Sequence, residues 1–119
     1  MADRQAEVGK LLDLVETSLD EDKAEDLVVI DLQGKSSMAD YMVIATGRSD
    51  RHVGAMADHL MRRIKDAGFG RCRAEGLPRG DWVLIDAGDI VVHLFRAEVR
   101  AFYNLEKMWS VTMPERAAV

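Results

Sequence analysis

The chain has 119 residues and a mass of 13.3 kDa, the size of one ordinary domain. It carries 16 basic and 21 acidic residues, so its net charge is −5. A surface of that sign repels phosphate backbones and suits a basic protein partner, so no direct, specific nucleic-acid binding is expected. Its apolar runs are far shorter than the ~20 residues that cross a bilayer, which excludes a membrane span.

The cysteine count and the N-terminal residues further limit the class of protein. Cys72 is the single cysteine, which excludes an internal disulfide and leaves no second thiolate for a CxxC metal or redox site. The start, Met1-Ala2-Asp3-Arg4, lacks both the apolar core of a signal peptide and the acid-poor character of a transit peptide. We therefore expect a cytoplasmic protein with no metal ion or cofactor.

The N-terminal half predicts two helices and two strands. Apolar residues recur at helical spacing over residues 2–20 and again over 49–67, where Gly68 is the predicted stop. Between these helices, the β-branched runs 27–32 and 41–46 predict two strands joined by a polar loop. The two helical stripes are Val8, Leu11, Leu12, Val15 and Leu19, then Val53, Met56, Leu60 and Ile64.

The C-terminal half predicts a short edge strand, a hairpin and a closing helix. The edge strand covers 72–75, the hairpin pairs 82–86 with 90–95, and the helix covers 97–109. The hairpin turn is either Ala87-Gly88 or Gly88-Asp89. The order α-β-β-α-β-β-β-α predicts a single α/β domain over 1–119, with a mixed sheet of about five strands and flanking helices.

Two loops contain fragments of phosphate-binding motifs. Gly34-Lys35-Ser36 resembles the end of a phosphate loop, but Val29 stands where that motif needs glycine and a strand follows, so a plain polar turn is favoured. Gly47-Arg48-Ser49 lies between a strand and a helix, where backbone N–H groups of a nucleotidyltransferase-like enzyme would hold an anion. Such enzymes also need clustered carboxylates for magnesium, and no strand carries two at i, i+2 spacing. Helix N-capping by Ser49 or Asp50 is therefore favoured, with the enzyme as the alternative.

The histidines of the second helix do not predict a metal site. His52 and His59 lie seven residues apart, about 10.5 Å along the axis, which is too far to chelate one ion. We expect them on the surface or in a groove. No Ser/His/Asp or Cys/His arrangement follows from the spacing, so the chain is predicted not to be an enzyme.

The hairpin has the same two faces with either turn. One face is uniformly apolar and should meet the core. It carries Val83, Ile85, Ile90, Val92 and Leu94. The other face mixes aromatic, aliphatic and acidic groups, as a partner-binding surface does, unless the closing helix covers it as a second core layer. It carries Trp82, Leu84, Asp86, Asp89, Val91, His93 and Phe95.

Four ordered blocks cover about residues 8–110 and leave 111–119 as a tail without an assigned role. The blocks are Gln33-Gly34-Lys35-Ser36-Ser37 with Asp40, then 46–53, then Asp81-Trp82-Val83-Leu84-Ile85-Asp86 through 88–93, and finally 100–109. Together they resemble the successive signatures of the Iojap/RsfS ribosomal silencing factor family.

The resemblance implies a nucleotidyltransferase-like fold without catalytic carboxylates, and homodimers of the free protein. It also implies that the protein binds the large ribosomal subunit through its basic ribosomal protein number fourteen, blocks joining of the small subunit and represses translation under nutrient limitation. We expect the second hairpin face and one edge of the last helix to hold this partner. The expected residues are Trp82, Leu84, Asp86, Asp89, His93 and Phe95, with Tyr103, Glu106 and Lys107.

Overall fold

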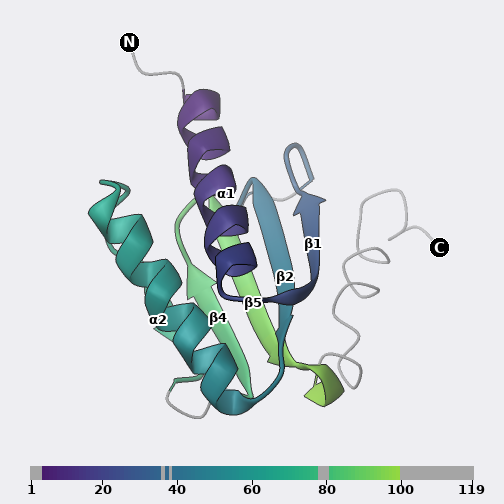
Figure 1. Ribbon diagram of the computed structural model, residues 1–119. Coiled ribbons are helices and arrows are strands. Elements are labelled where there is room, and N and C mark those ends of the chain that lie inside the picture. Colours follow the sequence, from purple (N-terminus) through teal and green to yellow (C-terminus); the bar gives the residue numbers. More distant parts are fainter. Residues whose placement is uncertain (1–3, 36, 38, 78–80, 100–119) are drawn as a thin grey trace, which may run out of the picture.

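The computed structural model describes residues 4–35, 37, 39–77 and 81–99, which form a five-stranded sheet with two helices packed on it (Figure 1). The order of the strands in the sheet is β1-β2-β5-β4-β3. The central pair, β2 and β5, is parallel, and the other neighbours are antiparallel. The predicted mixed α/β sheet is therefore confirmed. The strands are β1 (Glu25–Asp31), β2 (Tyr41–Gly47), β3 (Arg73–Glu75), β4 (Trp82–Asp86) and β5 (Ile90–Arg96).

Both helices lie on the same face of the sheet (Figure 1). Helix α1 covers Arg4–Glu21 and helix α2 covers Asp50–Asp66, within two residues of the predicted bounds. In the described part of the chain, no helix is long and apolar enough to cross a membrane. The sheet is therefore covered by helices on one side, and α2 follows β2 directly in the chain.

The ends of α2 are set by local hydrogen bonds. Ser49 has extended backbone angles, φ −153° and ψ 168°, and its Oγ accepts a hydrogen bond from the N–H of His52 at 3.1 Å. This confirms the predicted N-cap. At the other end Gly68 has φ 90°, and the N–H of Phe69 donates to the carbonyl of Ile64 at 3.1 Å. That pattern is a Schellman motif, so Gly68 ends the helix as predicted.

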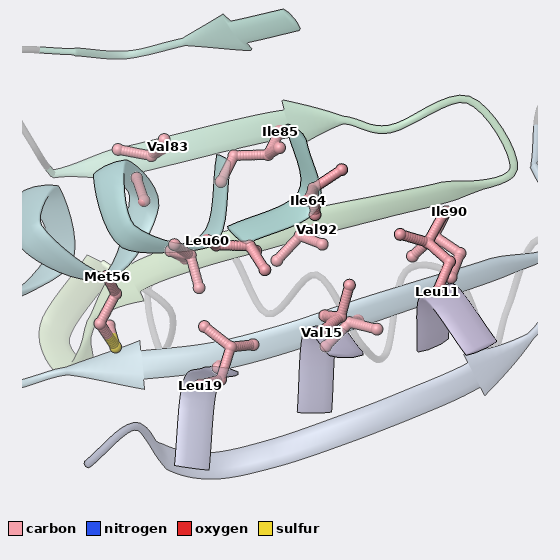
Figure 2. Close-up of a cluster of buried hydrophobic side chains, with 14 of the residues drawn as sticks. Leu11, Val15, Leu19, Met56, Leu60, Ile64, Val83, Ile85, Ile90 and Val92 are labelled. Atoms are coloured by element: carbon pink, nitrogen blue, oxygen red, sulfur yellow. The ribbon is translucent and has the colours of Figure 1, made fainter. Parts of the chain in front are cut away.

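The main core lies between the helices and the sheet (Figure 2). The predicted core face of the hairpin is confirmed, because its five apolar side chains are all fully buried. Each such burial stabilises the fold by about 1.5–3 kcal/mol. The stripe of α1 meets them through Leu11, Val15 and Leu19, and the stripe of α2 through Met56, Leu60 and Ile64.

A second cluster of buried side chains lies on the opposite face of the sheet. Its buried members are Leu32, Ala39, Met42, Ile44 and Phe95. Trp82, Val91 and Val99 are partly buried and pack against it. Val99 belongs to the helical turn 97–99 at the end of the described chain. The rest of the predicted helix over 97–109 lies outside the described residues.

The hairpin register settles which turn joins β4 and β5. Trp82 lies opposite Phe95, which is the register of the Gly88-Asp89 turn. Gly88 has φ 88° while Asp89 has no positive φ, the pattern of a type II′ turn. The Asp86 Oδ1 accepts a hydrogen bond from the N–H of Gly88 at 2.9 Å and tightens the turn. A two-residue turn therefore fixes which side chains of the two strands face each other.

The loop after β1 is the plain polar turn that the sequence favoured. The N–H of Lys35 donates to the carbonyl of Leu32 at 2.9 Å, and Gly34 has φ 76°, as the third residue of a type II turn requires. This hydrogen bond closes the turn within the chain itself. Ser36, the last residue of the fragment, lies outside the described part of the chain.

Gly76 and Gly70 distinguish two ways in which an added side chain destabilises the fold, backbone strain and steric collision. Both have a positive φ, 97° and 93°, but a Cβ at Gly76 would collide with the Trp82 carbonyl oxygen, whereas the space around Gly70 is open. We expect Gly70→Ala to lose about 1 kcal/mol of unfolding free energy from the backbone alone. Gly76→Ala should lose roughly 1–3 kcal/mol more, because the β3–β4 connection must move. Urea unfolding measures both, and equal losses would contradict the collision.

Candidate partner-binding face

Three rings from β4 and β5 form the centre of the second hairpin face. The rings of Trp82 and Phe95 meet edge-to-face, with centroids 4.9 Å apart and planes at 89°. His93 lies beside both, with each pair of centroids 5.9 Å apart. The indole Nε1–H of Trp82 donates a hydrogen bond to the Nδ1 of His93 at 3.0 Å. The orientation of the indole is thus set by a ring contact and a hydrogen bond together.

This hydrogen bond also decides the protonation state of His93. Because an indole N–H can only donate, Nδ1 must be the unprotonated nitrogen and Nε2 carries the proton. Burial lowers the pKa of His93 from 6.5 to about 4. Protonation would also place a hydrogen on Nδ1, against the indole donor. His93 is therefore a neutral support for Trp82 at pH 7.

The predicted face residues differ in depth. Phe95 is fully buried and His93 is 8% exposed, so these two rings support the face from below. Trp82 and Leu84 are half-buried and Asp86 is exposed. A partner on this face would therefore meet the indole edge, Leu84 and the carboxylates. Tyr103, Glu106 and Lys107, predicted at the edge of the last helix, lie outside the described residues.

The turn end of the face is acidic and firmly attached to the sheet. The backbone carbonyl of Asp89 accepts hydrogen bonds from the N–H groups of Asp40 at 2.7 Å and Tyr41 at 3.2 Å. The turn is thereby tied to the start of β2. Asp86, three residues earlier, is exposed at the end of β4. Two carboxylate-bearing residues therefore stand at one end of the face on a fixed backbone.

A hollow of about 430 Å³ extends the face from β4 onto β3. It is lined by Arg73, Ala74, Glu75, Leu84 and Asp86. The two charged β3 residues, Arg73 and Glu75, are not among the predicted site residues, because a three-residue edge strand gives almost no periodic signal. Their position follows from the antiparallel register, in which Arg73 lies opposite Asp86 and Glu75 opposite Leu84.

Cys72 borders the same strand and shows no sign of an activated thiol. Burial raises the pKa of the Cys72 thiol, and the nearby carboxylate of Asp86 raises it further. A thiol with a raised pKa stays protonated and is a poor nucleophile. Among the residues that the structure describes, no group of three or more His, Cys, Asp or Glu could hold a metal ion.

The Gly47-Arg48-Ser49 loop is occupied by contacts within the chain. The N–H of Arg48 donates to the Nδ1 of His52 at 2.9 Å, while Ser49 caps the helix. A side chain at Gly47 would place its Cβ 2.6 Å from the Cγ2 of Val53. Glycine at this position is thus explained by the close approach of β2 and α2. The N–H of Arg48 and the glycine at position 47, which suggested an anion site, therefore both have structural roles.

The histidines of α2 bind the residue that follows α1. Because the Nδ1 of His52 accepts from the loop, its Nε2–H donates to the carbonyl of Asp22 at 2.6 Å. The Nδ1 of His59 lies 2.9 Å from the Asp22 carboxylate, and Arg63 lies 3.5 Å from it. These contacts join the end of α1 to α2. His52 and His59, predicted on the surface or in a groove, are both half-buried.

The comparisons with known proteins identify the family. A family model described as "Ribosomal silencing factor during starvation" matches residues 5–118. Since this match spans nearly the whole chain, the protein belongs to the ribosomal silencing factor family, whose name describes a regulatory role at the ribosome.

Individual relatives agree with the family model. A ribosomal silencing factor of Zymomonas mobilis is 63% identical over 99 residues, which are 83% of this chain and 74% of that protein. The crystal structure of a protein from Chromobacterium violaceum superposes on this chain with a TM-score of 0.82 at 35% sequence identity. The match covers 86% of this chain and 85% of that one. The mouse "Mitochondrial assembly of ribosomal large subunit protein 1" is 34% identical over 84% of this chain, but only 45% of that longer protein is covered.

The buried His93 predicts a specific pH dependence of stability. The unfolded chain binds a proton at a pKa near 6.5, whereas the folded chain binds it only near pH 4. Stability from this residue is therefore complete above pH 6.5 and is lost as the pH falls toward 4, by roughly 3 kcal/mol for this size of shift. Urea unfolding at pH 7, 5.5 and 4 measures the loss.

The matched control for this experiment is His93→Asn. The amide oxygen of asparagine can accept from the Trp82 indole near the position of Nδ1, but the side chain does not titrate. The substitution leaves every other titratable residue in place, so the difference between the two proteins isolates His93. Identical pH dependence in the two proteins would show that the pKa of His93 is not lowered.

Proposed function

We propose that this protein binds the large ribosomal subunit through ribosomal protein number fourteen and blocks the joining of the small subunit. It would thereby repress translation when nutrients are limiting. Membership of the silencing factor family supports a role at the ribosome, and the name of the mouse relative points to the large subunit. The choice of ribosomal protein rests on the resemblance to Iojap/RsfS proteins. We further propose that the protein acts in the cytoplasm.

The observation that carries the proposal is the half-exposed, pre-oriented Trp82. Tryptophan is enriched among residues that dominate binding energy, and a side chain held in place loses little conformational entropy on binding. The contacts to Phe95 and His93 supply this orientation in the free protein. Phe95 and His93 therefore serve the interface by supporting Trp82.

The charged residues of the face suit a basic partner. Asp86 and Asp89 stand at its turn end, and their carboxylates would steer Lys or Arg side chains during encounter. Leu84 adds apolar surface between Trp82 and these acids. We propose Tyr103, Glu106 and Lys107 as further contacts from the last helix. The proposed role of the protein is to occlude a surface, and it needs no catalytic group.

We also propose that the free protein forms a homodimer through this face. An aromatic and aliphatic surface that binds a partner is costly to leave exposed, and self-association covers it. Dimer and ribosome-bound forms would then use the same residues.

Sedimentation of purified subunits tests the proposal together with its anchor residue. The wild-type protein should travel with the large subunit and reduce the formation of whole ribosomes. Trp82→Ala should bind about thirtyfold more weakly, a loss of ~2 kcal/mol, mainly through faster dissociation. In light scattering the same variant should shift the free protein toward monomer. Undiminished subunit joining, with no wild-type protein in the large-subunit peak, would overturn the function.

A second variant separates binding from folding. Leu14 is half-buried on α1 and packs on the main core, away from the hairpin face. Leu14→Ala should therefore destabilise the protein without touching the proposed face. If both variants bind equally weakly at matched fractions of folded protein, Trp82 is not the anchor.

The acidic residues should affect the rate of association. We expect Asp86→Asn and Asp89→Asn to slow association several-fold at low salt and to have little effect at high salt, because exposed charges are screened. Surface plasmon resonance with the isolated ribosomal protein separates the two rates. Asp13→Asn on α1 is an exposed control for the loss of one charge. An equal slowing by the control would argue against local steering.

A further inference from the structure

Charge is distributed unevenly along this acidic chain. Residues 62–73 contain five basic residues and one acidic residue, a net charge of +4. They are Arg62, Arg63, Lys65, Asp66, Arg71 and Arg73. Because the whole chain has 16 basic and 21 acidic residues, the remainder holds 11 and 20, a net charge of −9. Such asymmetry is typical of proteins that meet a polyanion with one part of their surface.

The fold gathers these cations at the end of α2 and the start of β3. The side chains of Arg62, Lys65, Arg71 and Arg73 are exposed, and we call these four the basic patch. They differ from Arg63, which donates to the Ser18 Oγ at 2.7 Å and joins α2 to α1. Within the described part of the chain, none of the four has an ion-pair partner within 4.0 Å. Their charge is therefore available to a ligand.

A hollow of about 340 Å³ lies within this region. It is lined by Met61, Arg62, Lys65, Arg71 and Cys72. Among the described residues its lining has three cations and no aromatic ring, so it offers charge and donors but no surface on which a base could stack. This composition suits phosphate oxygens, which Arg and Lys bind without regard to sequence.

The basic patch reaches the partner-binding face through Arg73, and its other three cations line the hollow beside the end of α2. Arg73 lies opposite Asp86 in the β3–β4 register and shares with Asp86 and Leu84 the hollow that extends that face. A molecule that docks its acidic and aromatic face on a basic ribosomal protein would thus turn an adjoining cationic surface toward whatever surrounds that protein. On a ribosome the surroundings of a protein are largely RNA.

We propose that the basic patch binds the phosphate backbone of ribosomal RNA when the neighbouring face binds its ribosomal protein. The inference rests on the proposed function. RNA is favoured over an acidic protein because exposed, unpaired cations around an aromatic-free hollow match a repeating phosphate charge. The patch adds affinity and orientation, whereas the choice of site comes from the protein face. A net charge of −9 elsewhere on the chain explains why free RNA alone would be bound weakly.

The first test compares two triple variants with the same net charge. Arg62→Gln/Lys65→Gln/Arg71→Gln removes three patch cations, and Lys10→Gln/Lys35→Gln/Arg51→Gln removes three exposed cations elsewhere. Affinity for purified large subunits is measured from about 50 to 300 mM salt. The patch variant should bind roughly tenfold more weakly at low salt, and its slope of log affinity against log salt should be shallower by about 2 to 3. The control variant should match the wild type, and thermal melts should show both variants folded.

The results distinguish failure of this inference from failure of the proposed function. If the wild type does not bind the large subunit at all, the proposed function fails. If the wild type binds and the patch variant matches the control in affinity and salt slope, only the RNA contact fails. Equal losses in both triple variants would show a bulk charge effect and also overturn the patch.

A crosslink identifies the class of molecule that the patch touches. Lys65→benzoylphenylalanine, irradiated in the complex with the large subunit, should give an adduct that ribonuclease removes. The same photoprobe in place of Lys35 should give no RNA adduct. An adduct at position 65 that survives ribonuclease and is removed by protease would show an acidic protein on the patch and overturn the proposal.

Discussion

The strand β5 is buried on both faces, and the rest of the molecule is arranged around that constraint. From Val92 to Phe95 every side chain is buried: Val92 and Leu94 lie in the main core, Phe95 lies in the second cluster, and His93 lies beside Phe95. Because both faces of this strand are apolar, other side chains must pack against each of them. The helices cover one side, and the second cluster builds up on the other. Trp82, opposite Phe95, therefore rests on a packed layer with only part of its ring exposed.

Much of the fold could be predicted from local patterns, and the depth of the candidate site could not. Alternation along β4 and β5 assigned each side chain to a face correctly, because a strand has a period of two. It could not show that Phe95 is buried, since Met42 and Ile44 of the same buried cluster come from β2 through a long-range parallel pairing. Helical spacing likewise indicated that His52 and His59 do not share a metal ion, but it could not reveal that both contact Asp22.

The overall net charge predicted a basic partner but concealed how the charge is distributed. The net charge of the whole chain does not reveal the segment 62–73, whose net charge is +4. This segment is also divided between two elements, the end of α2 and the short edge strand β3. The antiparallel β3–β4 pair then brings this segment beside the acidic end of the hairpin. Residues of opposite charge, Arg73 and Asp86, therefore lie opposite each other at that edge of the sheet.

The position of β5 also has a consequence for how the protein is made. It lies in the middle of the sheet but is the last of the described strands to be synthesised. Until residue 96 has been translated, β2 and β4 have no common neighbour, and their apolar edges stay open. The parallel pairing between β2 and β5 must then close across the intervening helix, a slow, non-local step. A nascent copy therefore completes its sheet only after β5 has been synthesised, with its hydrophobic edges within reach of chaperones until then.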